Sequence, residues 1–203
     1  LTDMEITYGF VVVGGGLTGV LSFSSLALAI GTEYWYIIED KRANHTDPAR
    51  TNSGLWGVTD DVQSHTEDTG YSESERQMEI MHSVIAILLP LSLVMLVFGG
   101  ICGLVSSLAR SRTLLIGSAS YFLLCSLLTL SGVSLYIRYS QKALEETERR
   151  MGHEQMAQVH TSFGWSMGMA WISFLLEVIT GLLLLLAVRL VPLTQYEESV
   201  API

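Results

Sequence analysis

The chain has 203 residues, a mean hydropathy of +0.41 and only 15% charged residues, and its formal net charge is −9. Soluble domains carry about 25% charged residues, so this composition excludes an ordinary soluble globular protein. The acidic balance also argues against nucleic acid as a partner, because the phosphate backbone attracts basic surfaces.

Four segments of the chain are apolar throughout: residues 10–30, 84–108, 114–137 and 163–188. The single charged residue within them is Glu177. Each segment approaches the about 20 residues that a helix needs to cross a bilayer. The apolar residues continue around each helix instead of forming one stripe. The sequence therefore predicts four membrane-spanning helices.

Residues 1–9 form an N-terminal tail ahead of the first apolar segment. A secretory signal peptide would begin with basic residues, but this tail carries Asp3 and Glu5 and no basic residue. We therefore expect the first apolar segment to be a retained helix. Because the chain begins at Leu1, either earlier residues are missing or translation starts at Met4.

The first apolar segment contains a glycine-rich motif of the kind found in nucleotide-binding sites. Gly14, Gly16 and Gly19 match G-x-G-x-x-G after a run of valines, and acidic residues follow about 20 positions later. Such a fold needs further strands alternating with amphipathic helices, whereas three more apolar segments follow here. Gly15 and Gly19 also have the G-x-x-x-G spacing that lets membrane helices approach closely. We therefore expect helix packing at these glycines, with no bound nucleotide and no other cofactor.

A long polar segment, residues 31–83, separates the first two apolar segments and carries eleven acidic but only four basic residues. Asn44 begins an N-glycosylation sequon within it, which favours an extracellular loop glycosylated at this position. Both termini would then lie in the cytosol, with the protein in the plasma membrane. The other polar segments become a cytosolic turn, a second extracellular loop and a cytosolic tail, at residues 109–113, 138–162 and 189–203.

The distribution of basic residues points to the opposite orientation. The positive-inside rule expects Lys and Arg on the cytosolic side, but the orientation above places three inside and eight outside. We keep the polar segment outside because of the sequon, and because the turn Arg110-Ser111-Arg112 is basic without an acidic residue.

Aromatic residues begin and end the first part of this polar segment. Residues 34–39 are aromatic and β-branched, which favours a strand leaving the membrane surface, with Trp35 near the headgroups. Residues 54–59 are expected to form a second strand, and residues 43–53 the turn between the two. Residues 60–75 are polar and acidic, and we expect them to be disordered.

Motifs along the chain resemble one family of membrane proteins. Trp35 followed by Gly54-Leu55-Trp56 resembles the claudin-type four-span superfamily, which includes tight-junction claudins and auxiliary gamma subunits of calcium channels and glutamate receptors. Within this superfamily, four later motifs resemble transmembrane proteins 235 and 114, at residues 89–93, 101–108, 132–137 and 162–167. The resemblance implies a mainly α membrane protein, with a left-handed four-helix transmembrane bundle and a small extracellular β-sheet.

The chain departs from this family in its cysteines. In the family, two cysteines after Gly-Leu-Trp bridge two strands, but here residues 57–60 are Gly-Val-Thr-Asp and the next cysteine is Cys102. Because a structural disulfide contributes about 2–4 kcal/mol, we expect a less rigid loop. Cys102 and Cys125 lie at different depths of two apolar segments, so we expect buried free thiols and no disulfide between them.

The later helices carry three further features. Gly99 and Gly103 are expected to give the second helix a close-packing face. Residues 141–151 contain Glu–Arg pairs four positions apart, which predict an exposed helical extension of the third helix. Glu177 is a functional candidate because it is an ionisable residue within a span. We consider a structural carboxyl that is protonated or bonded by Ser or Thr, recognition of a partner helix, and ion transport, and favour the first.

The chain shows no set of residues for catalysis. There is no nucleophile–base pair, and His153 and His160 lack a third ligand, so we expect neither an enzyme nor a metal site. We expect a non-enzymatic protein of the lipid bilayer that binds another membrane protein, or itself, through its extracellular loops and helix faces. It would act as an auxiliary subunit or in adhesion. The alternative is a cell-junction claudin that forms a barrier or a paracellular pore.

Overall fold

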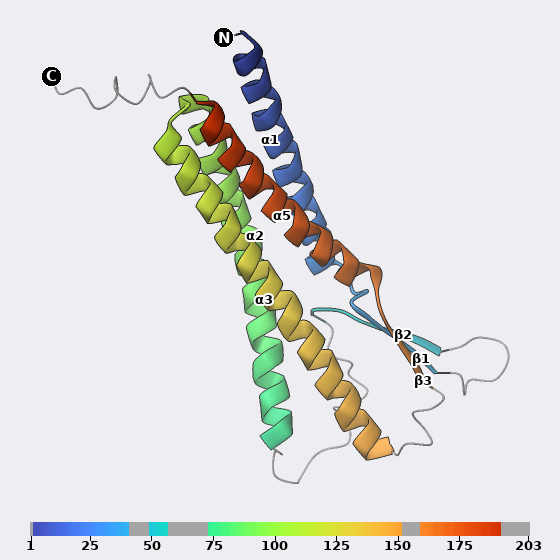
Figure 1. Ribbon diagram of the computed structural model, residues 1–203. Helices are drawn as coiled ribbons and strands as arrows, with labels where there is room; N and C mark the ends of the chain where they lie inside the picture. The colour runs from blue at the N-terminus through green and yellow to red at the C-terminus, as the bar shows by residue number, and fades with distance from the viewer. Residues whose placement is uncertain (1, 41–48, 57–72, 152–158, 192–203) are drawn as a thin grey trace. The chain divides into compact units, whose positions relative to one another are not determined.

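The computed structural model describes residues 2–40, 49–56, 73–151 and 159–191. Within these ranges the chain forms four helices and three strands (Figure 1). In chain order they are α1 (Thr2–Gly31), β1 (Tyr36–Asp40), β2 (Ala49–Ser53), α2 (Glu73–Ala109), α3 (Arg112–Met151), β3 (Val159–Phe163) and α5 (Trp165–Leu190).

All four helices are long and apolar enough to cross a membrane, and most of their apolar side chains are exposed or only partly buried. Exposed apolar surface of this extent requires a bilayer around it. The prediction of a mainly helical, four-span protein is therefore confirmed.

Two helices extend well beyond their apolar segments. α3 has 40 residues, which at 1.5 Å per residue corresponds to about 60 Å, roughly twice the apolar thickness of a bilayer. The predicted helical extension after residue 137 is confirmed, because α3 continues unbroken to Met151. α2 begins at Glu73, so the expectation of disorder is wrong for residues 73–75, while residues 60–72 lie outside the described ranges.

The chain divides into two compact units. Unit 1 consists of Leu1–Leu26, Leu91–Leu130 and Ile172–Ile203, and unit 2 of Ala27–Pro90 and Ser131–Trp171. Unit 1 is a bundle built from parts of all four helices. Unit 2 contains the three strands and the other parts of the four helices.

Small residues bring the helices of unit 1 together. A Cβ atom placed on Gly15 would lie 3.8 Å from Leu183, and one on Gly19 would lie 3.8 Å from Thr180, so both glycines of α1 face α5. Their whole segment is helical. The strand-turn-helix arrangement that a dinucleotide-binding motif requires is therefore absent from this stretch.

Glycines of α2 face α3 in the same unit. A Cβ on Gly99 would lie 2.9 Å from the Tyr121 ring, and one on Gly103 would lie 3.5 Å from Phe122. The aromatic rings of α3 therefore occupy the space that the missing side chains leave on α2.

The three strands of unit 2 form an antiparallel sheet in the order β2-β1-β3 (Figure 1). Tyr36 at the start of β1 lies opposite Ser53 of β2 and Phe163 of β3. The sheet thus joins the first polar segment to the end of the second one, which sequence reasoning did not anticipate.

The expected second strand at residues 54–59 is wrong for residues 54–56, and residues 57–59 lie outside the described ranges. β2 occupies Ala49–Ser53, within the stretch assigned to the turn, and residues 54–56 are not in a strand. A Cβ on Gly54 would lie 2.6 Å from Glu33 Cα, so the chain passes against the backbone of residue 33 there instead of continuing as a strand. Pairing with β1 decides where β2 forms, although its sequence has little intrinsic strand preference.

Candidate functional site

Three side chains cap the C-terminal end of α1 in unit 2. The last carbonyl groups of a helix lack partners within the helix. Here Thr32 Oγ1 donates to Leu28 O at 2.6 Å, Trp35 Nε1 donates to Ala29 O at 2.7 Å, and Trp56 Nε1 donates to Ile30 O at 3.0 Å. Three successive carbonyl groups are therefore satisfied by side chains that follow the helix in the sequence.

The two tryptophans of this cap have different environments. Trp35 is fully buried, and its ring lies 4.7 Å from the Tyr136 ring of α3 between centroids. Trp56 is 57% exposed, although the preceding Leu55 is fully buried. Leu55 therefore anchors the Gly-Leu-Trp segment, while Trp56 combines a hydrogen bond to the helix end with a largely exposed ring.

The start of α5 is fixed to the chain that follows α1. Gly164 N donates to Trp35 O at 3.0 Å, Ser166 N donates to Tyr34 O at 3.3 Å, and the Thr32 and Ser166 hydroxyl groups lie 2.6 Å apart. A Cβ on Gly164 would lie only 1.7 Å from Tyr34 O. Only glycine permits this close approach.

Four aromatic rings lie beside this junction, and those of Tyr34, Phe163 and Trp165 are exposed. Tyr34 and Trp165 form one ring pair with centroids 5.8 Å apart, and Tyr36 and Phe163 form a second pair at 6.0 Å. Phe163 and Trp165 are each 51% exposed. Tyr and Trp are favoured at membrane–water interfaces, and aromatic residues are enriched in protein interfaces.

Glu177 lies on α5 in unit 1 and is fully buried. Thr129 Oγ1 of α3 lies 2.9 Å from its Oε1 and 3.2 Å from its Oε2. Ser173, one turn earlier on α5, donates to Oε1 at 3.3 Å. The contacts of this carboxyl group among the described residues are thus hydroxyl groups, and its burial leaves no surface for a partner helix.

The hydroxyl contacts continue to the other two helices. Ser92 Oγ of α2 lies 2.7 Å from Thr129 Oγ1. Ser22 Oγ of α1 donates to Ser173 O at 3.0 Å. Ser22, Ser92, Thr129 and Ser173 are buried like Glu177, so one polar network joins all four helices in the interior of unit 1.

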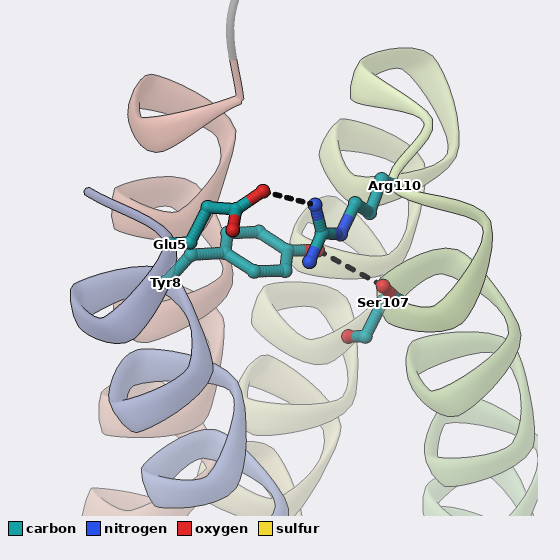
Figure 2. A network of polar contacts seen from close by, with 4 residues as sticks. All are labelled: Glu5, Tyr8, Ser107 and Arg110. Atoms are coloured by element: carbon teal, nitrogen blue, oxygen red, sulfur yellow. Dashed lines mark hydrogen bonds and ion pairs between the residues drawn. The ribbon is translucent and has the colours of Figure 1, made fainter. Parts of the chain in front are cut away.

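A second polar network in unit 1 joins the start of α1 to the end of α2 (Figure 2). Tyr8 donates through its hydroxyl to Ser107 O at 3.0 Å. The Arg110 guanidinium lies 5.4 Å from the centroid of the Tyr8 ring, and its Nη1 lies 3.4 Å from Glu5 Oε1. Glu5 and Arg110 are both exposed, so their ion pair contributes little, and the buried Tyr8 hydroxyl makes the stronger contact.

The cysteines require one correction. Both are free thiols, as expected, and Cys125 is buried, but Cys102 is exposed. Apolar character did not distinguish the two positions, because the outer face of a membrane helix is as apolar as its inner face.

Several predicted residues lie outside the described ranges, including Asn44, His153 and residues 192–203 of the C-terminal tail. Among the described residues, no group of three His, Cys, Asp or Glu side chains is placed to hold a metal ion. Of the predicted site residues, the structure brings Trp35 and Trp56 together at one helix end and sets Glu177 apart from them in the other unit.

The sequence predicted a Ser or Thr partner for Glu177 but did not identify Thr129 and Ser173, and it gave no indication of the capping role of Thr32. A usable signal was present, since hydroxyl residues are unusual inside apolar segments and commonly form contacts between membrane helices. The buried ones in this network are Ser22, Ser92, Thr129 and Ser173.

Comparison with known proteins places these features in a family. Residues 20–186 match the family described as PMP-22/EMP/MP20/Claudin tight junction. Voltage-dependent calcium channel gamma-3 subunits of Rattus norvegicus, Mus musculus and Homo sapiens are 26% identical over 182 residues, covering 79% of this chain. The chain spans 55% of the length of these relatives. Since the family match covers most of the chain, this multi-pass membrane protein belongs to the PMP-22/EMP/MP20/Claudin family.

Proposed function

We propose that this protein is a non-enzymatic auxiliary subunit of the plasma membrane, which binds a channel or another membrane protein through its extracellular loops and helix faces. The observation that carries this proposal is the similarity to the calcium channel gamma-3 subunits. We propose further that, within the family, it is a relative of transmembrane proteins 235 and 114, which the resemblance of motifs such as residues 132–137 and 162–167 supports.

The proposal includes an orientation in the membrane. The spans are residues 10–30, 84–108, 114–137 and 163–188, the sheet is extracellular and both termini are cytosolic. The sequon at Asn44 supports this orientation. Glycosidase treatment of protein from mammalian cells is expected to increase its electrophoretic mobility. A glycan on a sequon engineered into the cytosolic tail would contradict the orientation.

The surface we assign to the partner is the exposed aromatic region beside the sheet. Interfaces are enriched in aromatic residues, which bury large areas, and Phe163 and Trp165 present half of their area to the surroundings. The Glu177 network offers no such surface, because its side chains are buried within the bundle.

A pair of substitutions tests the surface. Phe163→Ala removes an exposed ring beside the sheet, and Phe98→Ala removes a ring of similar exposure, 57%, from the outer face of α2. The protein is co-expressed with the pore-forming subunit of a voltage-gated calcium channel and purified in mild detergent. We expect the wild type to co-purify with the channel subunit and Phe98→Ala to bind it equally well. Phe163→Ala should bind the channel subunit with an affinity lower by at least about tenfold, since an interface anchor contributes roughly 2 kcal/mol of binding free energy.

Two outcomes would count against this assignment. Loss in Phe98→Ala alone would move the interface to the helix faces. Failure of the wild type to co-purify with this channel, or to change its current, would remove the calcium channel as the partner.

The second candidate is a junction claudin that forms a barrier or a pore between cells. The family description, which names the tight junction, favours it. The lack of cysteines in residues 57–60 argues against it, because a paracellular strand needs a rigid extracellular domain. Strand formation between transfected fibroblasts would support this candidate over the first.

A further inference from the structure

Thr129 makes more polar contacts than one hydroxyl hydrogen can serve. Its Oγ1 lies 2.7 Å from Ser92 Oγ, 3.2 Å from Cys125 O, and 2.9 and 3.2 Å from the two oxygens of Glu177. A hydroxyl group donates one hydrogen and accepts two. If Glu177 were ionised, Cys125 O and both carboxylate oxygens would compete for that single hydrogen.

Ser173 also has more acceptors within reach than its one hydroxyl hydrogen can serve. Its hydroxyl lies 2.9 Å from Ser22 O and 3.3 Å from Glu177 Oε1. An ionised Glu177 would thus depend on two hydroxyl hydrogens, each of which also has a backbone carbonyl within reach. Among the described residues no cation contacts it. An uncompensated charge at this depth is strongly unfavourable.

We propose that Glu177 is a proton-binding site of the bundle, in which the carboxyl group is held neutral and donates a hydrogen bond to Thr129. One added proton gives Thr129 a full set of hydrogen-bond partners. Glu177 Oε2–H donates to Thr129 Oγ1, Ser92 also donates to it, and Thr129 donates to Cys125 O. Thr129 then donates once and accepts twice, which is its full capacity. Glu177 Oε1 remains an acceptor for Ser173.

The surroundings of Glu177 are consistent with a permanently neutral group. The groups that face the network from α1 and α2 are the hydroxyls of Ser22 and Ser92. The titratable group nearby on α3 is the buried free thiol of Cys125, which carries no positive charge in any state. Among the described residues, these contacts supply no positive charge that would hold the carboxyl group ionised.

A neutral Glu177 also bears on partner binding. A neutral carboxyl with filled hydrogen bonds requires no Arg or Lys from another protein. The network is therefore complete within one chain, and recognition of a partner does not depend on Glu177. The inference is independent of the proposed function.

Infrared spectroscopy of the full chain in lipid bilayers tests the proposal. At neutral pH, water-exposed carboxyl groups are ionised, so a C=O stretching band of a protonated carboxylic acid reports a buried neutral one. We expect this band in the wild type, its shift on ¹³C labelling of the glutamate carboxyl groups, and its loss in Glu177→Gln. In Thr129→Val the band is expected to persist but move to higher wavenumber, because the acid O–H loses its acceptor.

Each other result overturns the proposal. Absence of the band in the wild type means that Glu177 is ionised. Persistence of the band in Glu177→Gln assigns it to another acid. An unmoved band in Thr129→Val removes Thr129 as the acceptor. If Glu177→Gln does not fold, the isotope shift and the Thr129→Val spectrum still show whether a neutral glutamate donates to Thr129, since both experiments leave Glu177 in place.

Discussion

The capping of α1 by two indole groups leads to a prediction about their relative contributions. Trp35→Phe and Trp56→Phe each delete one N–H donor that serves a carbonyl at the same helix end. The chemical change is identical, and the burial differs, since Trp35 is fully buried and Trp56 is 57% exposed. The two variants therefore separate the cost of a lost hydrogen bond from the cost of an unsatisfied buried carbonyl.

The expected magnitudes follow from that difference. In Trp35→Phe, Ala29 O has no access to water, so the unsatisfied carbonyl costs about 1–3 kcal/mol. The smaller ring also leaves space beside Tyr136, which adds to the loss. We expect a decrease of about 2–4 kcal/mol in the free energy of unfolding. In Trp56→Phe, water can replace the indole, so we expect a decrease of about 0.5–1 kcal/mol.

The measurement is reversible unfolding in mixed micelles by addition of sodium dodecyl sulfate, followed by circular dichroism. Trp165→Phe is the matched control, because Trp165 is half exposed and no hydrogen bond of its indole is found among the described residues. It should change the free energy of unfolding by less than about 0.5 kcal/mol. A cost for Trp56→Phe equal to or above that of Trp35→Phe would refute the reasoning from burial.

Two further predictions concern a close backbone approach and the network of Figure 2. Gly164→Ala would place a Cβ against Tyr34 O and is expected to prevent accumulation of folded protein. Gly168→Ala is the control, because Gly168 lies four residues later in α5 and a Cβ there has no atom within 4 Å. This variant should leave the free energy of unfolding unchanged or raise it by up to about 1 kcal/mol. Equal expression of Gly164→Ala and Gly168→Ala would contradict the prediction. Tyr8→Phe removes the buried bond to Ser107 O and should lower the free energy of unfolding by about 1 kcal/mol, whereas no change would show that the contact contributes nothing.

The helical part of the fold was accessible from sequence because its signal is local. A run of apolar residues long enough to cross a bilayer must satisfy its backbone hydrogen bonds within itself, so length and composition suffice. The extension of α3 to Met151 followed from charge spacing along one helix, which is also local.

The sheet was predicted less well because its strands pair across long distances in the sequence. β1 pairs with β3 through Tyr36 and Phe163, and no local pattern reports that pairing. The stretch from residue 54 contains Trp56, Val58 and Thr59, which are residue types that favour strands. The contact of Gly54 with residue 33 is a tertiary constraint that overrides this preference.

The candidate site divides in the same way. The sequence by itself determined that Glu177 lies within a span and that Trp35 and Trp56 flank the first part of the polar segment, because residue type and spacing are enough for both. Only the tertiary structure decided what these residues do. Trp35 and Trp56 donate hydrogen bonds to the end of α1. Thr129 contacts Glu177, Ser92 contacts Thr129, and Ser22 contacts Ser173. All of these contacts depend on positions in space that helical and strand periodicity do not encode.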